Sequence, residues 1–294
     1  MSDHIDFFSF FCYHKVMKLE TGITTNSKCS VSGRRTLAKI RLAGFKNVML
    51  DQEGNRNLER FISVAFENGL KVPFIHMDSK GTEALWFDTS KKEEYLSYAR
   101  KTIETCGRHG IKTVVMHASY EGITIPPNKI GLESMNEIVK IASDNNVKIA
   151  LENTDIEKHN LFEFLLENID SPNLGFCFDS GHWNLYYPQT DLLGKYGKKL
   201  MAVHLHDNVG ININEDGWKK DLHLLPFDGT TDFNTVAEGI AKSNYNGPIM
   251  LESRRKHKAK EYRYCGIDEY EFLRRAQERA EKISSMIESF REAK

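Results

Sequence analysis

The feature of this sequence that most constrains its fold is a repeated alternation of short apolar segments with longer segments of helical periodicity. The apolar segments span residues 19–25, 46–51, 70–76, 111–117, 147–152, 173–179, 200–206 and 248–253. Nearly continuous apolar runs are typical of parallel strands that are buried on both faces, and consecutive parallel strands need a connecting helix. Each repeat therefore predicts one strand followed by one helix.

The segments between these strands are expected to be helices. They span residues 33–43, 55–69, 91–109, 132–145, 158–168, 232–243 and 267–292. Gly44, Gly69, Gly110 and Gly247 stand at the turns from helix to strand, where a left-handed residue ends a helix at low cost. Repeated strand–helix units without an interdomain linker predict a single (β/α)₈ barrel, the TIM-barrel fold, and the length of 294 residues suits it.

A doubly wound open sheet is the alternative architecture for the same alternation. Such a sheet usually has a Gly-rich phosphate-binding turn after its first strand, and the segment TTNSKCSVSG, residues 24–33, lacks the GxGxxG spacing. The sequence therefore favours the barrel. Residues 1–17 precede the first strand and are expected to be an N-terminal extension, which leaves residues 18–294 as the catalytic barrel domain.

Charge and cysteine content limit the partners that the chain is expected to have. The formal net charge is −1, so no global field attracts the chain to nucleic acid or to an anionic membrane. The apolar stretch at residues 5–13 is too short to cross a bilayer. The five cysteines are scattered and form no CxxC pair, which argues against disulfides and a thiolate zinc site and predicts a cytoplasmic location.

Ionisable residues occupy the last positions of the later strands. His76, His117, Glu152 and Asp179 end the third to sixth expected strands, His204 and His206 belong to the seventh, and Glu252 belongs to the eighth. The C-terminal ends of barrel strands surround one shared mouth, so these side chains are expected to converge. A lone strand-end histidine is more often a structural group, but six consecutive strands with this ending predict a metal site. Imidazole and carboxylate ligands suit zinc, manganese or cobalt.

Two loops add candidates to this set. His182 lies three residues after Asp179 in the loop expected after the sixth strand, and Asp221 and His223 form a DxH pair in the loop after the seventh. A DxH pair in a loop is a weak signal by itself, because acidic residues and histidines are common on surfaces. Beside the strand-end residues, it indicates additional metal ligands.

Several motifs together resemble the xylose isomerase-like TIM-barrel superfamily. They are LENT at 151–154, FDSGHW at 178–183, HLHDN at 204–208, DLHLLPFDGTTDF at 221–233 and LES at 251–253. This superfamily contains sugar and sugar-phosphate isomerases and epimerases, inosose-processing enzymes and the endonuclease IV type of abasic-site nuclease. The resemblance covers nearly the whole chain after residue 18 and implies a divalent metal, as one to three ions.

The resemblance also implies which residues bind the metal. Matched motif by motif, the shared ion would be held by Glu152, Asp179, His204 and Glu252. The additional ligands of a three-zinc cluster would be His76, His117, His182, Asp221 and His223. His204 and His206 face the same side of a strand, and the family spacing to Asp207 favours His204 as ligand. His206 is then expected to contact substrate or support the ligands.

Two enzyme activities and one binding function remain as hypotheses. The preferred one is a metal-dependent isomerase or epimerase of a sugar, sugar phosphate or inosose-like carbonyl compound, in which Glu152 and Glu252 transfer a proton and His182 holds a substrate oxygen. The alternative is an endonuclease IV-like zinc phosphodiesterase. It is disfavoured by the neutral charge and by the segment after His76, which differs from the corresponding nuclease loop. A non-catalytic metal- or sugar-binding barrel would lack turnover, which the paired glutamates argue against.

Three residues outside the metal set are expected to contact the substrate. These residues are His206, Trp183 and Arg254. Trp183 lies in an expected loop at the barrel mouth, where a flat ring could stack on a sugar, and Trp86 and Tyr186 lie in similar expected loops. Arg254 follows the eighth strand, in the region where barrels often bind a substrate phosphate. The expected partner is thus a small sugar or sugar phosphate, with nucleic acid disfavoured and no membrane.

Overall fold

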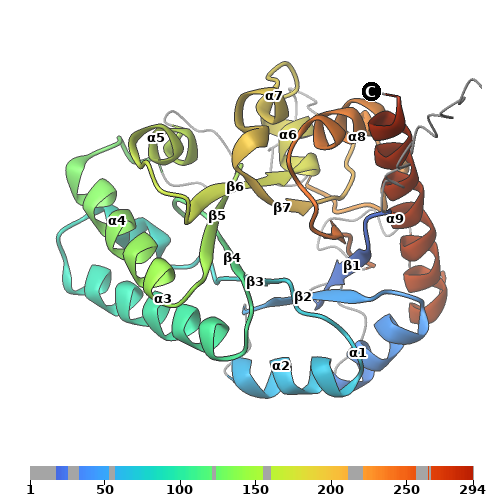
Figure 1. Cartoon of the computed structure of the whole chain (residues 1–294), viewed down its shortest axis with the longest axis horizontal. Coiled ribbons are helices and arrows are strands. Elements are labelled where there is room, and N and C mark those ends of the chain that lie inside the picture. The colour runs from blue at the N-terminus through green and yellow to red at the C-terminus, as the bar shows by residue number, and fades with distance from the viewer. Residues whose placement is uncertain are drawn as a thin grey trace, which may run out of the picture.

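The strands of this protein form one parallel sheet that curves into a nearly closed barrel (Figure 1). The structure, a computed structural model, describes residues 18–25, 33–52, 57–120, 124–154, 160–210, 221–255, 264 and 266–293. The strands are β1 Thr21–Thr24, β2 Asn47–Asp51, β3 Phe74–His76, β4 Thr113–Met116, β5 Lys148–Glu152, β6 Leu174–Asp179, β7 Leu200–His204 and β8 Ile249–Leu251. Each pairs with the next in sequence up to β7, and β1 also pairs with β8. A single bridge, Leu205 to Leu251, connects β7 to β8.

This pairing confirms the predicted (β/α)₈ barrel and excludes the doubly wound sheet. In an open doubly wound sheet, the first and last strands would not meet and the order would reverse at a switch point. Here the order runs around the barrel without reversal. The predicted extension, residues 1–17, lies outside the described residues, so that boundary stays a prediction.

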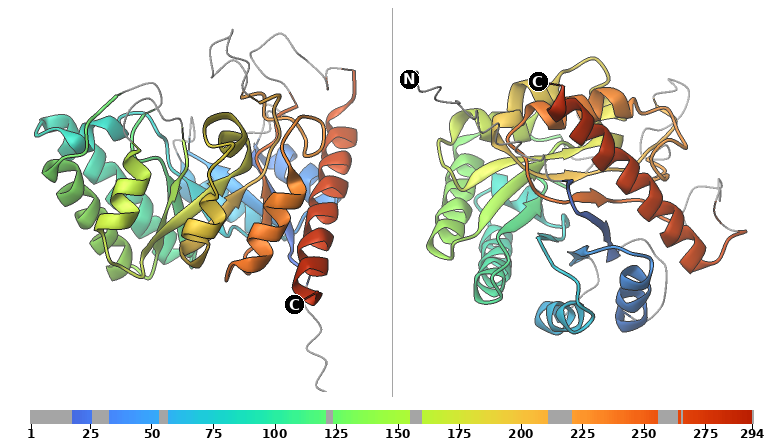
Figure 2. Two further views of the ribbon diagram at one scale, coloured as in Figure 1. Left: turned by 90° about the horizontal axis from the view of Figure 1, so that it is seen from above. Right: turned by 45° about the vertical axis from the view of Figure 1, so that its right-hand side comes forward.

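Helices surround the sheet on its outer side (Figures 1 and 2). The seven expected helices are present in the described residues as α1 Gly33–Leu42, α2 Leu58–Glu67, α3 Ser90–Arg108, α4 Lys129–Asp144, α5 Leu161–Asn168, α8 Phe233–Lys242 and α9 Glu269–Glu292. Four shorter elements were not expected: the 3₁₀ helices η2 Thr82–Trp86 and η3 Gly197–Lys199, and the helices α6 Ser180–Tyr186 and α7 Leu192–Tyr196. Three of them occupy the connection between β6 and β7.

The last helix shows how a predicted segment packs. Asp268 caps the N-terminus of α9, where its side chain accepts a hydrogen bond from the backbone N–H of Glu271. Phe272, Leu273, Ala276, Ala280, Ile283 and Ile287 are buried along one face of the helix, at helical spacing. This face contacts β1, β8 and α8. Helix α9 therefore covers the barrel where the first and last strands pair (Figure 2).

Turn geometry agrees with most of the glycine predictions. Gly44, Gly69 and Gly110 adopt positive φ values of 105°, 70° and 72°. The prediction was wrong for Gly247, which has no positive φ, whereas Asn146 before β5 has φ of 55°. Within the described ranges, none of the helices is long and apolar enough to span a membrane.

Candidate metal centre

The predicted site residues lie together at the C-terminal ends of the strands, although several stand just beyond the hydrogen-bonded strand. Glu152 and Asp179 end β5 and β6, and His76 and His204 end β3 and β7. His117 follows the end of β4 at Met116, and Glu252 follows the end of β8 at Leu251. His206 also lies beyond β7, so the expected strands were too long. The extended chain continues past its last ladder pair and still directs these side chains into the mouth.

Four buried side chains form the centre of the site. Glu152, Asp179, His204 and Glu252 each offer a ligand atom, and these atoms lie within 4.8 Å of one another. His204 Nδ1 is 3.2 Å from Glu152 Oε2 and 3.0 Å from Glu252 Oε2. The exposed fractions of the four residues are 1%, 0%, 0% and 7%, in the order named. These residues are the central quartet, and they are the four that the motifs implied as ligands of the shared ion.

Glu152 is surrounded by imidazoles from four different segments. Its Oε2 lies 3.1 Å from His76 Nε2 and 3.5 Å from His117 Nε2, in addition to His204. Its Oε1 lies 3.2 Å from His182 Nδ1. His76, His117 and Glu152 form a second group with metal-ligand spacing. Glu152 therefore connects the central quartet to the β3–β4 side of the mouth.

A third group lies on the β6–β7 side of the quartet. His223 Nε2 is 2.8 Å from Asp221 Oδ2, and His206 Nε2 is 3.7 Å from Asp221 Oδ1. The His206 and His223 rings stack with their centroids 4.0 Å apart. His206 Nε2 also lies 3.0 Å from Asp179 Oδ1. His206, Asp221 and His223 have metal-ligand spacing. His182, also predicted as an additional ligand, has this spacing with Asp179 and His206, and its Nε2 lies 3.6 Å from Asp221 Oδ2.

The close charges shift the pKa values of these groups. Burial raises the pKa of Glu152, but His204 and the other imidazoles outweigh it and hold the pKa well below the usual range. Burial lowers the pKa of His76, whereas the Glu152 carboxylate raises it, and the result is a pKa of about 9. The same balance raises the pKa of His182 and His204 well above the ordinary value. Without a cation, the mouth thus favours protonated His76, His182 and His204 beside ionised carboxylates, whereas burial lowers the pKa of His223.

A test of metal fit comes from buried polar atoms that lack hydrogen bonds. Among the described residues these atoms include Asp179 Oδ2, both ring nitrogens of His204 and of His206, Asp221 Oδ1 and Glu252 Oε2. A buried polar atom without a partner usually costs about 1–3 kcal/mol, so such a concentration at one place needs a ligand to offset it. Neutral imidazole and carboxylate donors suit Zn²⁺, Mn²⁺ or Co²⁺. The residues present therefore fit a divalent metal.

Hydrogen bonds within the protein fix the backbone that presents these groups. Asn153 donates from Nδ2 to the Asp179 carbonyl at 2.9 Å, and its Oδ1 accepts from the Asp179 N–H at 2.8 Å. The buried Asp207 carboxylate accepts from the backbone N–H groups of Asn208, Gly229 and Thr231 at 2.8–2.9 Å. Asp207 is thereby saturated by backbone donors. It anchors the loop that contains His223 and is not free to bind a metal.

His182 lies on a helix rather than in the expected loop. It belongs to the first turn of α6, because the Asp179 side chain caps this helix by accepting a hydrogen bond from the His182 N–H at 2.8 Å. Asp179 Oδ1 therefore caps α6, while Oδ2 has no hydrogen bond. The capping bond points the His182 ring back toward Glu152 and Asn153.

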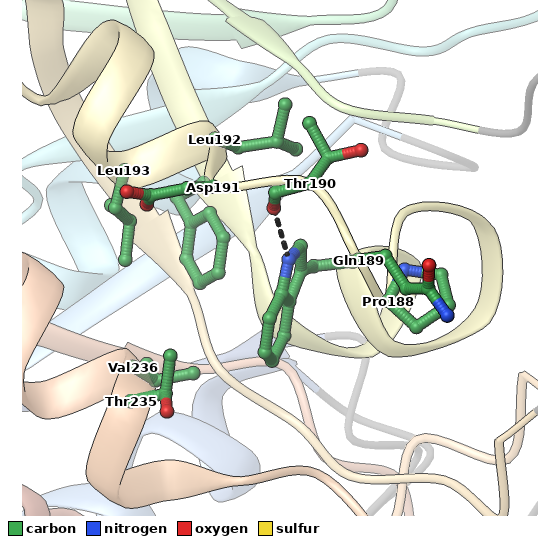
Figure 3. A pocket seen from close by; sticks show the side chains of 10 residues that line it. Pro188, Gln189, Thr190, Asp191, Leu192, Leu193, Thr235 and Val236 are labelled. Carbon is green, nitrogen blue, oxygen red and sulfur yellow. Dashed lines mark hydrogen bonds between the residues drawn. The ribbon is translucent and has the colours of Figure 1, made fainter.

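The aromatic residues expected at the mouth are placed differently. Trp86 lies in η2, is buried, and donates from Nε1 to the Ala118 carbonyl. Trp183 lies in α6 and donates from Nε1 to the Thr190 carbonyl, the dashed bond in Figure 3. Its ring packs near Phe178, on the opposite face of β6 from Asp179. The loop assignment was therefore wrong, and Trp183 lines a crevice outside the barrel instead of the metal group (Figure 3).

Tyr186 also lies in α6, with its ring centroid 6.1 Å from that of His182. Arg254 is at the mouth, as expected. Its Nη2 lies 3.5 Å from Glu252 Oε1, and its backbone N–H donates to the His223 carbonyl at 2.8 Å. Of the three expected substrate contacts, the structure therefore brings Arg254 and His206 to the metal group and leaves Trp183 outside.

Sequence reasoning missed one buried side chain. Cys177 lies two residues before Asp179 on the same face of β6, and it forms a group with Glu152 and His204. Burial raises the pKa of its thiol to about 12, so the neutral form is favoured. The alternation along β6 is the signal that indicates this residue, whereas a CxxC pattern detects only paired cysteines.

Comparisons with known proteins were made for the whole chain. Residues 37–287 match the sequence model of the family described as xylose isomerase-like TIM barrel. The uncharacterized protein y4fM of Sinorhizobium fredii is 32% identical over 164 residues, which are 54% of this chain and 48% of that protein. The inosose dehydratase of Histophilus somni is 27% identical over 139 residues, 41% of this chain and 46% of the enzyme. The chain thus spans about half the length of these relatives.

Solved structures give a longer match at lower identity. D-psicose 3-epimerase from Clostridium cellulolyticum H10, solved with D-tagatose, has a TM-score of 0.74 and 16% identity. The match covers 92% of this chain and 99% of the epimerase. At this identity, the likeness concerns the fold.

Proposed function

From the premise that this chain belongs to the xylose isomerase-like TIM-barrel family, we propose that it is a metal-dependent isomerase or epimerase of a sugar, sugar phosphate or inosose-like carbonyl compound. The resemblance inferred from the motifs is thereby confirmed at the level of the family. Relatives and structural neighbours include enzymes named inosose dehydratase and D-psicose 3-epimerase. Both names denote reactions of polyhydroxy carbonyl compounds, in which a proton beside the carbonyl is labile.

One observation supports the proposal most strongly: two carboxylates from separate strands converge on one atom. Glu152 Oε2 and Glu252 Oε2 lie 3.2 and 3.0 Å from His204 Nδ1. Proton removal at a stereocentre and its return from the other side need two carboxylates that face the same bound carbon. Glu152 and Glu252 approach from β5 and from the end of β8, which have β6 and β7 between them on one side of the barrel.

In this proposal Glu152, Asp179, His204 and Glu252 hold a divalent ion. When bound, such an ion polarises a carbonyl and lowers the energy of negative charge on its oxygen. Zn²⁺, Mn²⁺ and Co²⁺ all suit the donors, and the ion count is one to three. The additional candidate ligands are His76, His117, His182, His206, Asp221 and His223.

The remaining roles fall to the chain's own side chains. Glu252 is the more accessible carboxylate, with 9% of its side chain exposed against 1% for Glu152, so it is the better placed to take a proton from a substrate that enters the mouth. Glu152 contacts four imidazoles and is positioned to return the proton from within the cluster. His182 is buried beside Glu152 and can donate a hydrogen bond to a substrate oxygen.

Exchange of the substrate α-proton with solvent tests this function. Metal-restored protein is incubated in deuterated water with a panel of ketoses, aldoses, their phosphates and inososes, and deuterium incorporation is followed by NMR. We expect at least one compound to exchange, and Glu252→Gln to stop the exchange while retaining the fold by circular dichroism. Absence of exchange across the panel, with metal bound, would contradict the proposal.

The nuclease alternative is supported by one observation: several groups of described residues at the mouth each have metal-ligand spacing. A cluster of three zinc ions would use these same residues. Incubation of the zinc-loaded protein with abasic-site duplex separates the two activities. Nicking that Glu152→Gln abolishes would favour the nuclease, and its absence would leave the isomerase.

We also propose a cytoplasmic location. Cys106 and Cys177 are both free and buried, as is usual in a reducing compartment. Labelling of total thiols in protein from unfractionated cells, compared with the isolated cytosol, tests this assignment.

A further inference from the structure

Arg254 provides a permanent positive charge beside the metal group. Its Nη2 lies 3.5 Å from Glu252 Oε1, which is within ion-pair range but too long for a hydrogen bond of ordinary strength. Among the described ion pairs of the metal-group carboxylates, this one comes from an arginine, and the others come from histidines.

The guanidinium has donors that the described residues do not use. Arg254 Nε is inaccessible to solvent and has no hydrogen-bond partner there. The side chain is 22% exposed, so part of it is accessible to solvent. A guanidinium carries five N–H donors in a planar fork that matches the oxygens of a carboxylate or phosphate. Burying such donors without partners is unfavourable unless a ligand completes them.

The backbone holds this side chain in place. The Arg254 N–H donates to the His223 carbonyl at 2.8 Å. His223 has a φ of 47°, which is uncommon for a non-glycine residue. Its loop is also anchored by Asp207 through Gly229 and Thr231. The backbone of Arg254 is therefore fixed relative to Glu252, the carboxylate that the proposed reaction uses.

We infer that Arg254 binds an anionic group of the substrate, a carboxylate or a phosphate, and so selects charged over neutral polyhydroxy compounds. This inference rests on the proposed function for the identity of the mouth as the substrate site. It narrows the substrate class from sugars in general to sugar phosphates or sugar acids. The anion would lie beside Glu252, with the polyol chain extending toward the central quartet.

The next residue offers a matched control. Arg255 has the same charge and also a buried Nε without a hydrogen bond among the described residues. Its Nη1, however, donates to the Ile267 carbonyl, near the start of α9, and no described ion pair joins it to the metal group. Arg255→Gln removes the same charge one residue away. A general electrostatic effect would weaken anion binding in both variants, whereas direct recognition would do so only in Arg254→Gln.

Binding of three compounds without an aldehyde or ketone group tests the inference independently of turnover. The probes are erythritol, erythronate and erythritol 4-phosphate, titrated calorimetrically into the manganese-loaded protein. We expect Arg254→Gln to weaken the binding of at least one anion by about tenfold to a hundredfold and that of erythritol by less than about twofold. Arg254→Lys should recover part of the loss, since it keeps the charge without the fork.

The pattern of outcomes separates the inference from the proposed function. Loss confined to erythronate assigns a carboxylate substrate, and loss confined to the phosphate ester assigns a phosphorylated one. Equal weakening of all three probes, or an equal effect of Arg255→Gln, would overturn the inference. If Arg254→Gln loses anion binding but no compound exchanges its α-proton, the anion site stands and the isomerase proposal fails.

Discussion

The two ends of the barrel differ in how their buried polar groups are hydrogen-bonded. At the N-terminal end, Asn47 is 3% exposed, and its Nδ2 donates to Glu20 Oε2 at 3.1 Å and to the Thr21 carbonyl at 3.2 Å. Glu20 also accepts from Lys71 at 2.9 Å, and Thr21 donates to Gln277 at 2.8 Å. At the C-terminal end, Asp179, His204, His206, Asp221 and Glu252 keep buried atoms without hydrogen bonds.

The difference indicates which end is built for stability and which for a ligand. Polar groups that satisfy one another stabilise the folded chain and need nothing further. Groups that converge as close charges and leave buried atoms without hydrogen bonds cost stability, and they are retained where an ion or substrate completes them. Substitutions at the two ends should therefore separate activity from stability.

The largest effect is expected from Glu152→Gln. This change keeps the size of the side chain but removes the carboxylate that contacts four imidazoles, so it should weaken metal binding and lower the rate of α-proton exchange by about 10³-fold or more. Metal content and exchange rate are measured on the same preparation. If Glu152→Gln retained both, the mouth would not be the functional end.

Removal of the metal should destabilise the protein. An ion that binds only the folded state, present at a hundred times its Kd, contributes about 2.7 kcal/mol to the free energy of unfolding. Chelation should therefore lower Tm. Addition of Mn²⁺ or Zn²⁺ should restore Tm both in the wild type and in variants at the N-terminal end of the barrel, such as Asn47→Ala. A Tm that chelation leaves unchanged would mean that the unpaired groups do not hold an ion.

Both the stability of the metal-free protein and its apparent metal affinity are expected to depend on pH. His76 has a pKa of about 9 in place of 6.5, so its pair with Glu152 stabilises the metal-free protein below pH 6.5, and this stability is lost as the pH rises through about 9. A cation competes with these protons, so the apparent metal affinity should rise about tenfold per pH unit below pH 9 for each proton displaced. Titration calorimetry in buffers of different ionisation enthalpy measures the protons released, and no release at pH 7 would contradict this account.

The smallest effect on metal binding and activity is expected from a substitution at the N-terminal end of the barrel. Asn47→Ala removes the two hydrogen bonds to Glu20 and Thr21 and should lower the free energy of unfolding by about 1–2 kcal/mol. Metal content and exchange rate should stay at wild-type values. Chemical denaturation and metal analysis of the same variant check both, and a loss of metal here would break the distinction between the ends.

The sequence was sufficient to predict the barrel because its signal is repeated. Each strand is a buried apolar run, and seven of the eight were located within two residues at either end. The third was expected to begin at residue 70, four residues before β3 begins at Phe74. The expected strands were too long at the mouth, since His117, His206 and Glu252 stay extended after the last ladder bond. Strand pairing depends on the neighbouring strand, which a single segment does not encode.

The sequence predicted which residues belong to the site better than it predicted how they are arranged. Strand ends brought Glu152, Asp179, His204 and Glu252 together, as the barrel geometry requires. The helix α6 was missed because seven residues show too little periodicity, and its cap is Asp179, which the motif had marked as a ligand. Trp183 accordingly faces the outer crevice. The grouping of His206 with Asp221 and His223 depends on a loop path that spacing alone does not determine.

The most direct test of the central claim is the metal content of the protein purified without added metal, measured by mass spectrometry for the wild type, Asp179→Asn and Asn47→Ala. We predict at least about one divalent ion per chain in the wild type and in Asn47→Ala, and a large loss in Asp179→Asn, because carboxylate and imidazole ligands act as one set. About one ion would favour the isomerase site, and about three zinc ions the nuclease-like cluster. A wild type that neither retains nor takes up an ion would contradict the account.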